Sequence, residues 1–340
     1  MKTKIFNTFS ISVKAKKIIS VYSEIELLQS WQKASAKDPV LFLGSGSNTL
    51  FLENYQGTII LNRIKGFHVK ENNFFWNIHV CSGELWHNIV TICVNKGISG
   101  LENLSWIPGY TGAAPIQNIG AYGVEFKQVC SYVDFIFLET GEKVRLSSQE
   151  CNFGYRKSIF NSSKKFFNYA IVAIGLKLKK KWKACLNYTD LSFLEKEYVS
   201  PKKIYNKIFY IRKEKIPNPV YFGNAGSFFK NPLISSKQAK KILKNYPKAP
   251  CFKQLNGNVK FSAGWIIEAC GLKGYKLGKA AVYHKQASII INTGSATGYE
   301  IAYLAKYIFC IVKKNFSIQL EPEVKFISKI GEIKASKIIS

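Results

Sequence analysis

Apolar residues recur along the chain at two spacings, one typical of amphipathic helices and the other typical of strands. The helical spacing predicts helices at 24–37, 84–96, 235–246, 263–270 and about 296–314. Short apolar or alternating runs predict strands at 40–43, 58–61, 74–80, 132–138, 143–146, 167–178 and 317–327. The runs at 132–138 and 143–146 flank the turn Glu139-Thr-Gly-Glu142 and therefore predict a hairpin. This mixture indicates an α+β chain, with a boundary near Lys215 where glycine-rich turns begin to alternate with helices.

The last predicted strand alternates along its whole length. One face carries Ile318, Leu320, Pro322, Val324 and Phe326, and the other carries Glu321, Glu323 and Lys325. An exposed surface acid is the ordinary interpretation of Glu321 and Glu323. If Glu323 faces a pocket, it could instead act on a proton or on developing charge.

The longest break in the charge pattern lies between Glu102 and Glu125. Residues 103–124, called the uncharged segment below, contain no acid or base, although about one residue in five of the chain is charged. The segment is about as long as a membrane span, but its prolines, glycines, Gln117 and Asn118 would leave too many backbone groups unpaired in lipid. We expect irregular backbone packed against a large uncharged group, such as a bound cofactor.

Composition narrows the classes of protein. The 340 residues favour two or three domains, and 47% hydrophobic residues indicate a globular chain. The formal charge of +28 invites a nucleic-acid partner, but 45 lysines stand against four arginines, which are the better phosphate and base ligands. We therefore expect solvated surface lysines and no nucleic-acid partner. No secretory signal or spanning helix is evident, the eight cysteines form no C-x-x-C pair, and the histidines lack metal spacing. A reduced cytoplasmic protein with no metal and no membrane partner is expected.

The predicted strand at 40–43 runs into Gly44-Ser-Gly-Ser-Asn48, here called the glycine loop. Glycines allow positive φ, so successive N–H groups can surround a pyrophosphate. The loop has neither the Lys of a P-loop nor the third glycine of a dinucleotide fingerprint, whose place is taken by Thr49. An ordinary tight turn and a phosphate cradle both remain open.

Two further residues stand in segments that could carry chemistry. Ser227 lies in Gly223-Asn-Ala-Gly-Ser-Phe-Phe-Lys-Asn231, where it is either a turn serine or a proton donor in a glycine-lined site. Arg156 lies among aromatic residues, where its guanidinium suits either a structural ion pair or a carboxylate or enolate-like oxygen of a ligand. No G-x-S-x-G elbow is present, which argues against a hydrolase nucleophile.

Five segments, which follow one another in the family's order, together resemble the MurB family. Its members are flavoenzymes that act as UDP-N-acetylenolpyruvoylglucosamine reductases in peptidoglycan synthesis. They are residues 43–48, 107–123, 154–160, 223–232 and 320–324. Residues 182–215, which include Tyr188, resemble the insertion of the longer MurB subtype. The family implies an FAD-binding domain of the vanillyl-alcohol-oxidase/PCMH type with two α+β subdomains, followed by a C-terminal α+β substrate-binding domain. The implied division is 1–66 with 328–340, then 67–214 with an insertion at about 182–214, then 215–327.

The resemblance also implies a reaction and its residues. NADPH reduces bound FAD, and the flavin then passes hydride to the enolpyruvyl double bond of a UDP-sugar, which is the small-molecule substrate. We expect a bacterial enzyme that is a monomer. Arg156 and Glu323 would stabilise the enolate-like intermediate, with Glu323 protonated or donating through a neighbour, and Ser227 would donate the proton. Substrate would be held by Tyr122, Tyr188, Lys215, Asn231 and Gln286. FAD would be held by Gly44, Ser45, Gly46, Ser47, Asn48, Pro108, Gly109, Thr111, Gly112, Ile116, Gln117, Asn118, Ile119, Gly120 and Gly123.

Two rival functions remain at this stage. Another FAD-linked oxidase on the same scaffold would share the glycine loop without needing the Ser227–Glu323 pair. A basic RNA-binding protein would be colourless and would bind nucleic acid with a steep salt dependence.

Overall fold

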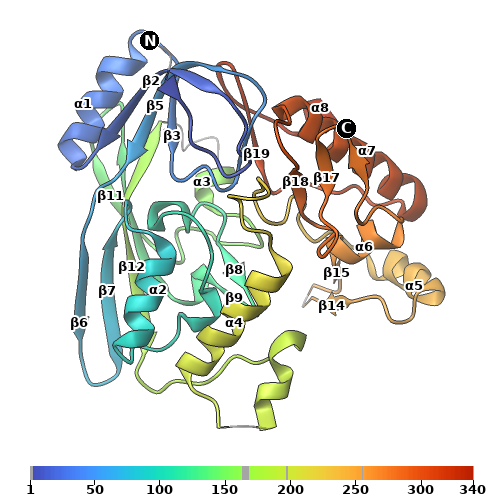
Figure 1. Cartoon of the computed structure of the whole chain (residues 1–340). Helices are drawn as coiled ribbons and strands as arrows, with labels where there is room; N and C mark the ends of the chain where they lie inside the picture. Colours follow the sequence, from blue (N-terminus) through green and yellow to red (C-terminus); the bar gives the residue numbers. More distant parts are fainter. Residues whose placement is uncertain (1–2, 163–167, 197, 255, 340) are drawn as a thin grey trace. The chain divides into compact units, whose positions relative to one another are not determined.

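The computed structural model describes residues 3–162, 168–196, 198–254 and 256–339. The chain forms two compact units (Figure 1). Unit 1 comprises Met1–Lys16, Gly46–Gly57 and Lys215–Ser340, and unit 2 comprises Lys17–Ser45 and Thr58–Glu214. Two strands, β2 (Lys14–Val21) and β5 (Tyr55–Asn62), begin in unit 1 and continue into unit 2.

Unit 2 is built on a five-stranded antiparallel sheet with the order β11-β10-β12-β7-β6. Its strands are β6 (Phe67–Glu71), β7 (Phe75–Cys81), β10 (Cys130–Phe137), β11 (Lys143–Ser147) and β12 (Tyr169–Lys179). The central strand β12 is buried on both faces because each face has its own core. Ile174 packs in a core with helix α2 (Trp86–Asn95), whereas Val172 packs with Leu27 of helix α1 (Glu24–Ser35).

The smaller elements of unit 2 surround this sheet. Strand β3 (Val40–Leu43) runs parallel to β5, with Val40 opposite Thr58. Helix α4 (Pro201–Lys215) buries Ile204, Ile208 and Ile211 on one face, against Leu191 and Leu194. The remaining elements are β8 (Gly120–Ala121), β9 (Val124–Glu125), α3 (Ile159–Ser162) and four short 3₁₀ turns at Glu102–Leu104, Thr111–Ala113, Phe126–Gln128 and Thr189–Lys196.

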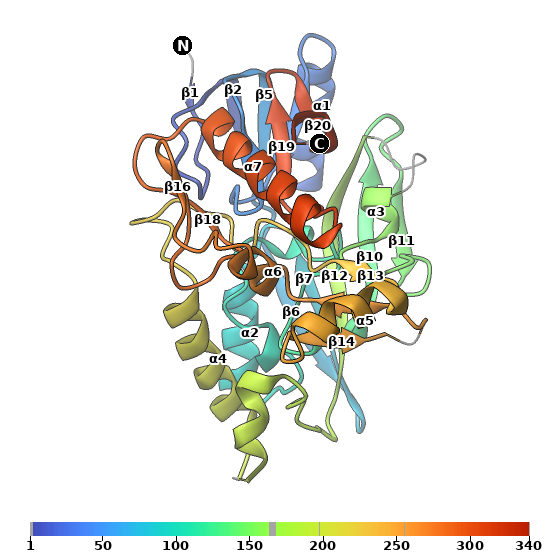
Figure 2. The same cartoon turned by 90° about the vertical axis from the view of Figure 1, so that its right-hand side faces the viewer.

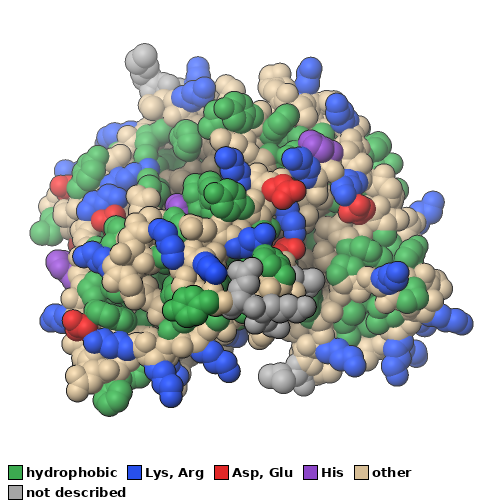
Figure 3. Space-filling view, turned by 60° about the horizontal axis from the view of Figure 1, so that its bottom comes forward, with side chains coloured by type: hydrophobic (Ala, Val, Ile, Leu, Met, Phe, Trp, Pro, Cys, Tyr) green, Lys and Arg blue, Asp and Glu red, His purple; other side chains and the backbone are tan. Residues whose placement is uncertain are grey.

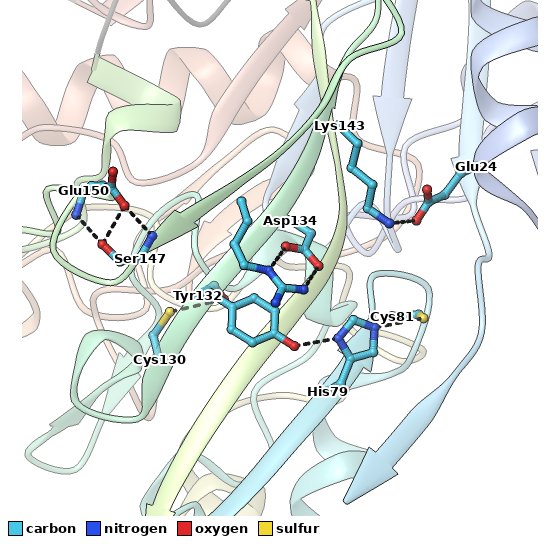
Figure 4. A network of polar contacts seen from close by, with 10 residues as sticks. Glu24, His79, Cys81, Cys130, Tyr132, Asp134, Lys143, Ser147 and Glu150 are labelled. Atoms are coloured by element: carbon cyan, nitrogen blue, oxygen red, sulfur yellow. Dashed lines mark hydrogen bonds and ion pairs between the residues drawn. The ribbon is translucent and has the colours of Figure 1, made fainter. Parts of the chain in front are cut away.

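A chain of polar side chains crosses the large sheet from β11 through β10 to β7 (Figure 4). The Arg145 guanidinium donates to both carboxylate oxygens of Asp134, at 2.7 and 2.8 Å, and lies 3.7 Å from the ring centre of Tyr132. The Tyr132 hydroxyl in turn lies 2.8 Å from Nδ1 of His79. Gly175 makes room for this ring, because a Cβ there would lie 2.1 Å from it. Arg145 therefore has the structural ion pair that is one ordinary role of a scarce arginine.

Unit 1 consists of small sheets and helices. The parallel pair β4 (Thr49–Phe51) and β19 (Lys325–Ser328) is extended by β20 (Gly331–Ile333), while β1 (Thr3–Lys4) pairs with the start of β2. Two three-stranded sheets have the orders β13-β15-β14 and β16-β17-β18. Their strands are β13 (Leu233–Ile234), β14 (Cys251–Lys253), β15 (Val259–Phe261), β16 (Lys276–Leu277), β17 (Ala280–Val282) and β18 (Ile290–Asn292).

Helix α7 (Gly298–Phe316) lies beside β17 and β18 (Figures 1 and 2). It begins at a capping box in which the Thr297 hydroxyl accepts from Glu300 N and the Glu300 carboxylate accepts from Thr297 N. The other helices of unit 1 are α5 (Ser236–Asn245), α6 (Ala263–Ala269) and α8 (Ser336–Ile339).

The five predicted helices are confirmed as α1, α2, α5, α6 and α7, with ends that shift by one or more residues. Strands 40–43, 58–61, 74–80, 132–138 and 143–146 are confirmed as β3, β5, β7, β10 and β11. Strand 167–178 is confirmed from Tyr169 onward as β12, whereas Phe167 lies outside the described residues. Sequence reasoning missed α4, β2 and β6.

The predicted strand at 317–327 is wrong in extent, since only Lys325–Ser328 forms a regular strand. Ser317 ends α7 with φ 54°, and Pro322 has no N–H to donate to a ladder. The predicted alternation nevertheless appears in the burial, because Ile318, Leu320 and Val324 are buried while Glu321 is exposed.

Candidate functional site

The uncharged segment in unit 2 has irregular backbone apart from short turns and the two-residue strand β8. Trp106, Asn118 and Tyr122 have left-handed φ values of 58°, 43° and 48°, and Gly109 and Gly123 also have positive φ. A left-handed residue other than glycine costs about 1–2 kcal/mol, and such residues concentrate at functional sites. The prediction of irregular backbone in this segment is confirmed.

The first half of the segment packs against the chain that follows β7. The Thr111 hydroxyl donates to the Cys81 carbonyl at 2.6 Å, and the Gly112 N–H donates to the Ser82 carbonyl at 3.1 Å. A Cβ at Gly112 would lie 2.7 Å from Cβ of Ser82, so this approach requires glycine. The segment is therefore fixed by backbone contacts that a larger residue would disrupt.

The glycine loop meets the same segment within unit 2. A Cβ on Gly44 would lie 3.4 Å from Cδ2 of Tyr110, whose ring is also covered by the Arg63 guanidinium at 4.5 Å. The unit therefore brings together two of the segments that the family resemblance assigns to FAD.

Two buried hydroxyls at this place fit a polar cofactor. Within the described residues, the Oγ atoms of Ser45 and Ser82 are buried and have no hydrogen-bond partner. A buried hydroxyl without a partner is costly, and a ligand with many acceptor oxygens, such as the diphosphate and ribityl chain of FAD, would remove that cost. The residues present therefore fit the cofactor that the resemblance implies.

The rest of the glycine loop belongs to unit 1. Gly46 has φ 65°, and a Cβ there would lie 2.9 Å from Cα of Asn7, so close packing as well as φ favours glycine. Asn48 donates through Nδ2 to the Glu323 carbonyl at 3.1 Å, and its own carbonyl accepts from Lys325 N at 3.0 Å. Unit 1 thus joins the end of the glycine loop to the backbone of a predicted catalytic residue.

Asn118 organises the second half of the uncharged segment. Its fully buried side chain donates to Glu125 Oε2 and the Gly154 carbonyl, each at 2.9 Å, and accepts from Lys127 N at 2.9 Å. Gly154 begins the turn that carries Arg156, whose φ is 53° and whose Nη2 donates to the Gly120 carbonyl at 3.3 Å. Unit 2 therefore brings Arg156 to the uncharged segment.

A second arginine, Arg212 on α4, also reaches the uncharged segment. Its Nε donates to the Trp106 carbonyl at 3.0 Å, and its side chain hydrogen-bonds with the Tyr122 hydroxyl. The Tyr122 ring makes an edge contact with Tyr188 at 5.2 Å. Burial raises the pKa of Tyr122 to about 12, although the Arg212 charge acts against that rise. Burial, together with the positive charge of Arg156, lowers the pKa of Arg212.

Arg212 is a functional candidate that sequence reasoning missed. The positive charges of Arg156 and Arg212 act on one another, and an anionic ligand would offset their repulsion, so this part of unit 2 suits such a ligand. The scarcity of arginine, four residues in 340, was the available signal.

In unit 1, Ser227 and Glu323 come from neighbouring extended segments. Phe228 donates through its N–H to the Ser288 carbonyl at 2.7 Å and accepts from Glu323 N at 2.8 Å. Ser227 and Phe229 form bridges to Ile289 and Pro322 on the two sides. Ser227 is exposed and Glu323 is half-buried, so Ser227 is accessible to a ligand.

Three predicted substrate residues also lie in unit 1. Asn231 accepts through Oδ1 from Ala263 N at 2.9 Å, Gln286 contacts Ser288 through Nε2 at 3.1 Å, and Lys215 lies at the end of α4.

The predicted flavin residues Ile116 and Ile119 lie in unit 2. Both are partly buried and pack against the core that includes α2.

The surface charge is consistent with solvated lysines. Figure 3 shows Lys and Arg side chains spread over one face and interspersed with apolar and uncharged groups. Several lysines pair with acids, as in Lys143 with Glu24 at 2.6 Å. Among the described residues, no helix is long and apolar enough to cross a membrane, and no group of three or more His, Cys, Asp or Glu is arranged to hold a metal ion.

Two models of known protein families match this chain. A model of FAD binding domains matches residues 15–147, so the chain contains an FAD-binding domain. A second model, of the UDP-N-acetylenolpyruvoylglucosamine reductase C-terminal domain, matches residues 218–327. The chain belongs to the UDP-N-acetylenolpyruvoylglucosamine reductase family, and the α+β fold with these two parts is confirmed.

Relatives support this assignment over the full length. Reductases of that name from Blochmanniella pennsylvanica and Photorhabdus laumondii are 53% and 50% identical, covering 98% and 100% of this chain and 97% and 100% of theirs. The Escherichia coli reductase is 47% identical over 99% of this chain and 98% of its own. The solved reductase of Thermus caldophilus is similar in fold, with a TM-score of 0.66 at 22% identity, over 96% of this chain and 98% of its own.

Proposed function

We propose that this chain reduces the enolpyruvyl group of UDP-N-acetylglucosamine enolpyruvate to UDP-N-acetylmuramate, using NADPH and bound FAD, in peptidoglycan precursor synthesis. The main support is that relatives 47–53% identical along nearly their whole length carry the name of this reductase. The buried hydroxyls of Ser45 and Ser82, which have no protein partner, and the close glycine approaches of unit 2 suit the FAD that the reaction requires.

The residues proposed to hold FAD are those of the glycine loop and the uncharged segment. When bound, FAD would accept hydride from NADPH and deliver hydride to the substrate. The proposed set is Gly44, Ser45, Gly46, Ser47, Asn48, Pro108, Gly109, Thr111, Gly112, Ile116, Gln117, Asn118, Ile119, Gly120 and Gly123. Asn118 would act through its backbone, because its side chain is committed to three protein partners.

The catalytic residues are proposed to be Arg156, Ser227 and Glu323. Hydride addition to the methylene carbon places negative charge on the neighbouring carbon and its carboxylate. The Arg156 guanidinium would stabilise this charge, and Glu323 would do so as a protonated acid or through a neighbour. The Ser227 O–H bond would then break as a C–H bond forms on that carbon.

Tyr122, Tyr188, Lys215, Asn231 and Gln286 are proposed to hold the UDP-sugar. Lys215 suits the diphosphate by charge, and Tyr122 lies between Tyr188 and Arg212. The proposal includes the division into 1–66 with 328–340, 67–214 and 215–327, and a monomer in the bacterial cytoplasm without nucleic acid. Light scattering of the purified protein with and without RNA checks that it is a monomer and that it does not bind RNA.

The test begins with a visible spectrum of the purified protein and with NADPH oxidation measured with and without the enolpyruvyl substrate. We expect a flavin spectrum and substrate-dependent oxidation. A protein that stays colourless after incubation with FAD would contradict the reductase. Oxygen consumption without the enolpyruvyl substrate would instead indicate an oxidase on the same scaffold.

The Ser227→Ala variant tests the assigned proton donor. We expect NADPH to reduce the flavin at nearly the wild-type rate, while reoxidation by substrate slows by about 10²–10⁴-fold, as is typical for loss of a general acid. Equal losses in both half-reactions would reject this role.

A further inference from the structure

A buried serine, Ser288, lies beside the exposed Ser227 in unit 1. The two Oγ atoms are 3.1 Å apart, and Nε2 of Gln286 lies 3.1 Å from Oγ of Ser288. Ser288 is only 4% exposed. Within the described residues, the Ser288 hydroxyl has these two side-chain partners.

The chemistry of the amide fixes the direction of one of these two bonds. An amide NH₂ group donates and does not accept, so Oγ of Ser288 accepts from Gln286. Either serine can donate the hydrogen bond between the two Oγ atoms, and the bond from Gln286 leaves the Ser288 proton available for Ser227. When Ser288 is the donor, the Ser227 hydroxyl accepts this bond and keeps its own proton for the accessible side.

The backbone holds this arrangement in place. Ser227 forms a bridge with Ile289, and Phe228 N–H donates to the Ser288 carbonyl, so the two serines lie on paired segments. Gly264 in α6 makes room for the Gln286 amide, because a Cβ there would lie 3.0 Å from Nε2. The serine pair is thus fixed by backbone pairing on one side and by a glycine on the other.

We propose that Ser288 is a positioning residue. It donates its hydrogen bond to Ser227, so that the Ser227 proton is directed to the accessible side. This inference rests on the proposed role of Ser227. As Ser227 gives its proton to the substrate carbon, negative charge develops on its Oγ, and the hydrogen bond donated by Ser288 stabilises that charge. The exposed Ser227 then recovers a proton from water. No covalent change occurs at Ser288.

The Ser288→Ala variant tests the proposal in a rapid-mixing experiment on the FAD-loaded enzyme. Flavin reduction by NADPH should keep its wild-type rate, while reoxidation by the enolpyruvyl substrate should slow about tenfold. The KM for substrate should change little, and the solvent deuterium isotope effect on reoxidation should increase. Loss of packing alone would not change the isotope effect.

Two further replacements of Ser288 test how the reoxidation rate depends on the strength of the hydrogen-bond donor. Ser288→Thr keeps an O–H and should restore most of the reoxidation rate, whereas Ser288→Cys keeps the volume with a weaker donor and should fall between Thr and Ala. Ser235→Ala is the matched control, because it removes the cap of α5 in the same unit without touching the serine pair. It should leave both half-reactions unchanged.

The outcomes separate this proposal from the proposed function. If Ser288→Ala reoxidises at the wild-type rate while Ser227→Ala is slow, the positioning role is wrong and the reductase stands. If Ser227→Ala is also fast, the role of Ser227 falls, and the role of Ser288 falls with it. If Cys and Thr at position 288 are as slow as Ala, the hydroxyl bond is not the cause, and the positioning role is rejected.

Discussion

The uncharged segment of unit 2 and the segment Gly223–Asn231 of unit 1 are both held in place by a buried asparagine, but their backbones differ beyond it. Both lack charge over most of their length, and each is organised by a buried asparagine that makes three hydrogen bonds. Asn118 binds Glu125, Lys127 and Gly154. Asn224 donates to the Pro217 and Phe222 carbonyls and accepts from Gly226 N.

The two segments differ in the course of the chain beyond the asparagine. After Asn118 the chain is irregular apart from the two-residue strands β8 and β9, with Tyr122 at positive φ, so it presents backbone groups and small residues. After Asn224 the chain becomes extended, and Phe228 bonds to neighbours on both sides. Irregular backbone suits the surface proposed to hold FAD, whereas the regular pairing around Ser227 suits the proposed proton donor, whose direction must be fixed.

Gly223→Ala should have the largest effect of the changes considered for these two segments. A Cβ at Gly223 would lie 2.1 Å from the Phe9 carbonyl oxygen, so backbone must move. We expect the free energy of unfolding to fall by about 3 kcal/mol or more. Urea denaturation measures this. Gly226→Ala is the control, because its φ is 69° but nothing lies within 4 Å of the new Cβ, and we expect a loss of only about 1 kcal/mol. Equal losses would show that strain, not the backbone clash, dominates.

Replacement of the two asparagines compares the segments directly. Asn118→Ala and Asn224→Ala each remove three hydrogen bonds made by a buried amide, so each should lower stability by about 3 kcal/mol. Asn118→Ala should weaken FAD retention after gel filtration, because it loosens the uncharged segment. Asn224→Ala should keep its FAD and instead slow reoxidation by substrate. The division of labour would be refuted if both variants lost flavin equally.

Gly112→Ala tests the close approach of the uncharged segment to Ser82. The new Cβ would meet Cβ of Ser82 at 2.7 Å, so the segment must shift by a few tenths of an ångström. We expect about a tenfold weaker affinity for FAD, corresponding to overpacking at the low end of about 1–3 kcal/mol. Titration of the apoprotein with FAD, monitored by flavin fluorescence, measures the affinity. Gly97→Ala has positive φ but open space, and should leave the affinity unchanged.

The elements that the sequence predicted are those with clean apolar spacing. Helix α7 and strand β12 carry long apolar runs, so their periodicity was visible. Helix α4 was missed because its lysines masked Ile204, Ile208 and Ile211, although these lie at helical spacing. Strand β2 was missed for the same reason, since Lys14, Lys16 and Lys17 interrupt its apolar residues.

The candidate site was predicted less evenly. Arg156, Ser227 and Glu323 could be selected because they stand in family motifs. Arg212 and Ser288 could not, because their importance arises only from contacts distant in sequence, with Tyr122 and Ser227. Spacing along a chain gives no signal for such a pair.

The smallest predicted effect is a pH dependence confined to unit 2. Nδ1 of His87 accepts from Trp106 N at 3.0 Å, so the bond exists only while that nitrogen is unprotonated. Burial, with a smaller contribution from Arg212, lowers the pKa of His87 below its usual 6.5. The stabilisation is therefore present above pH 6.5 and is lost as the pH falls through the lowered pKa. His79 has a lowered pKa too, chiefly through burial, and acts in the same direction. The side chains of Asn224, Ser227, Gln286 and Ser288 do not titrate in this range.

Between pH 7.5 and 5.5, FAD affinity should decline slightly in the wild type and less in His87→Gln, whose amide oxygen can accept from Trp106 at either pH. With His79→Gln as the second variant, an unchanged pH dependence in both would show that neither histidine links protonation to the uncharged segment.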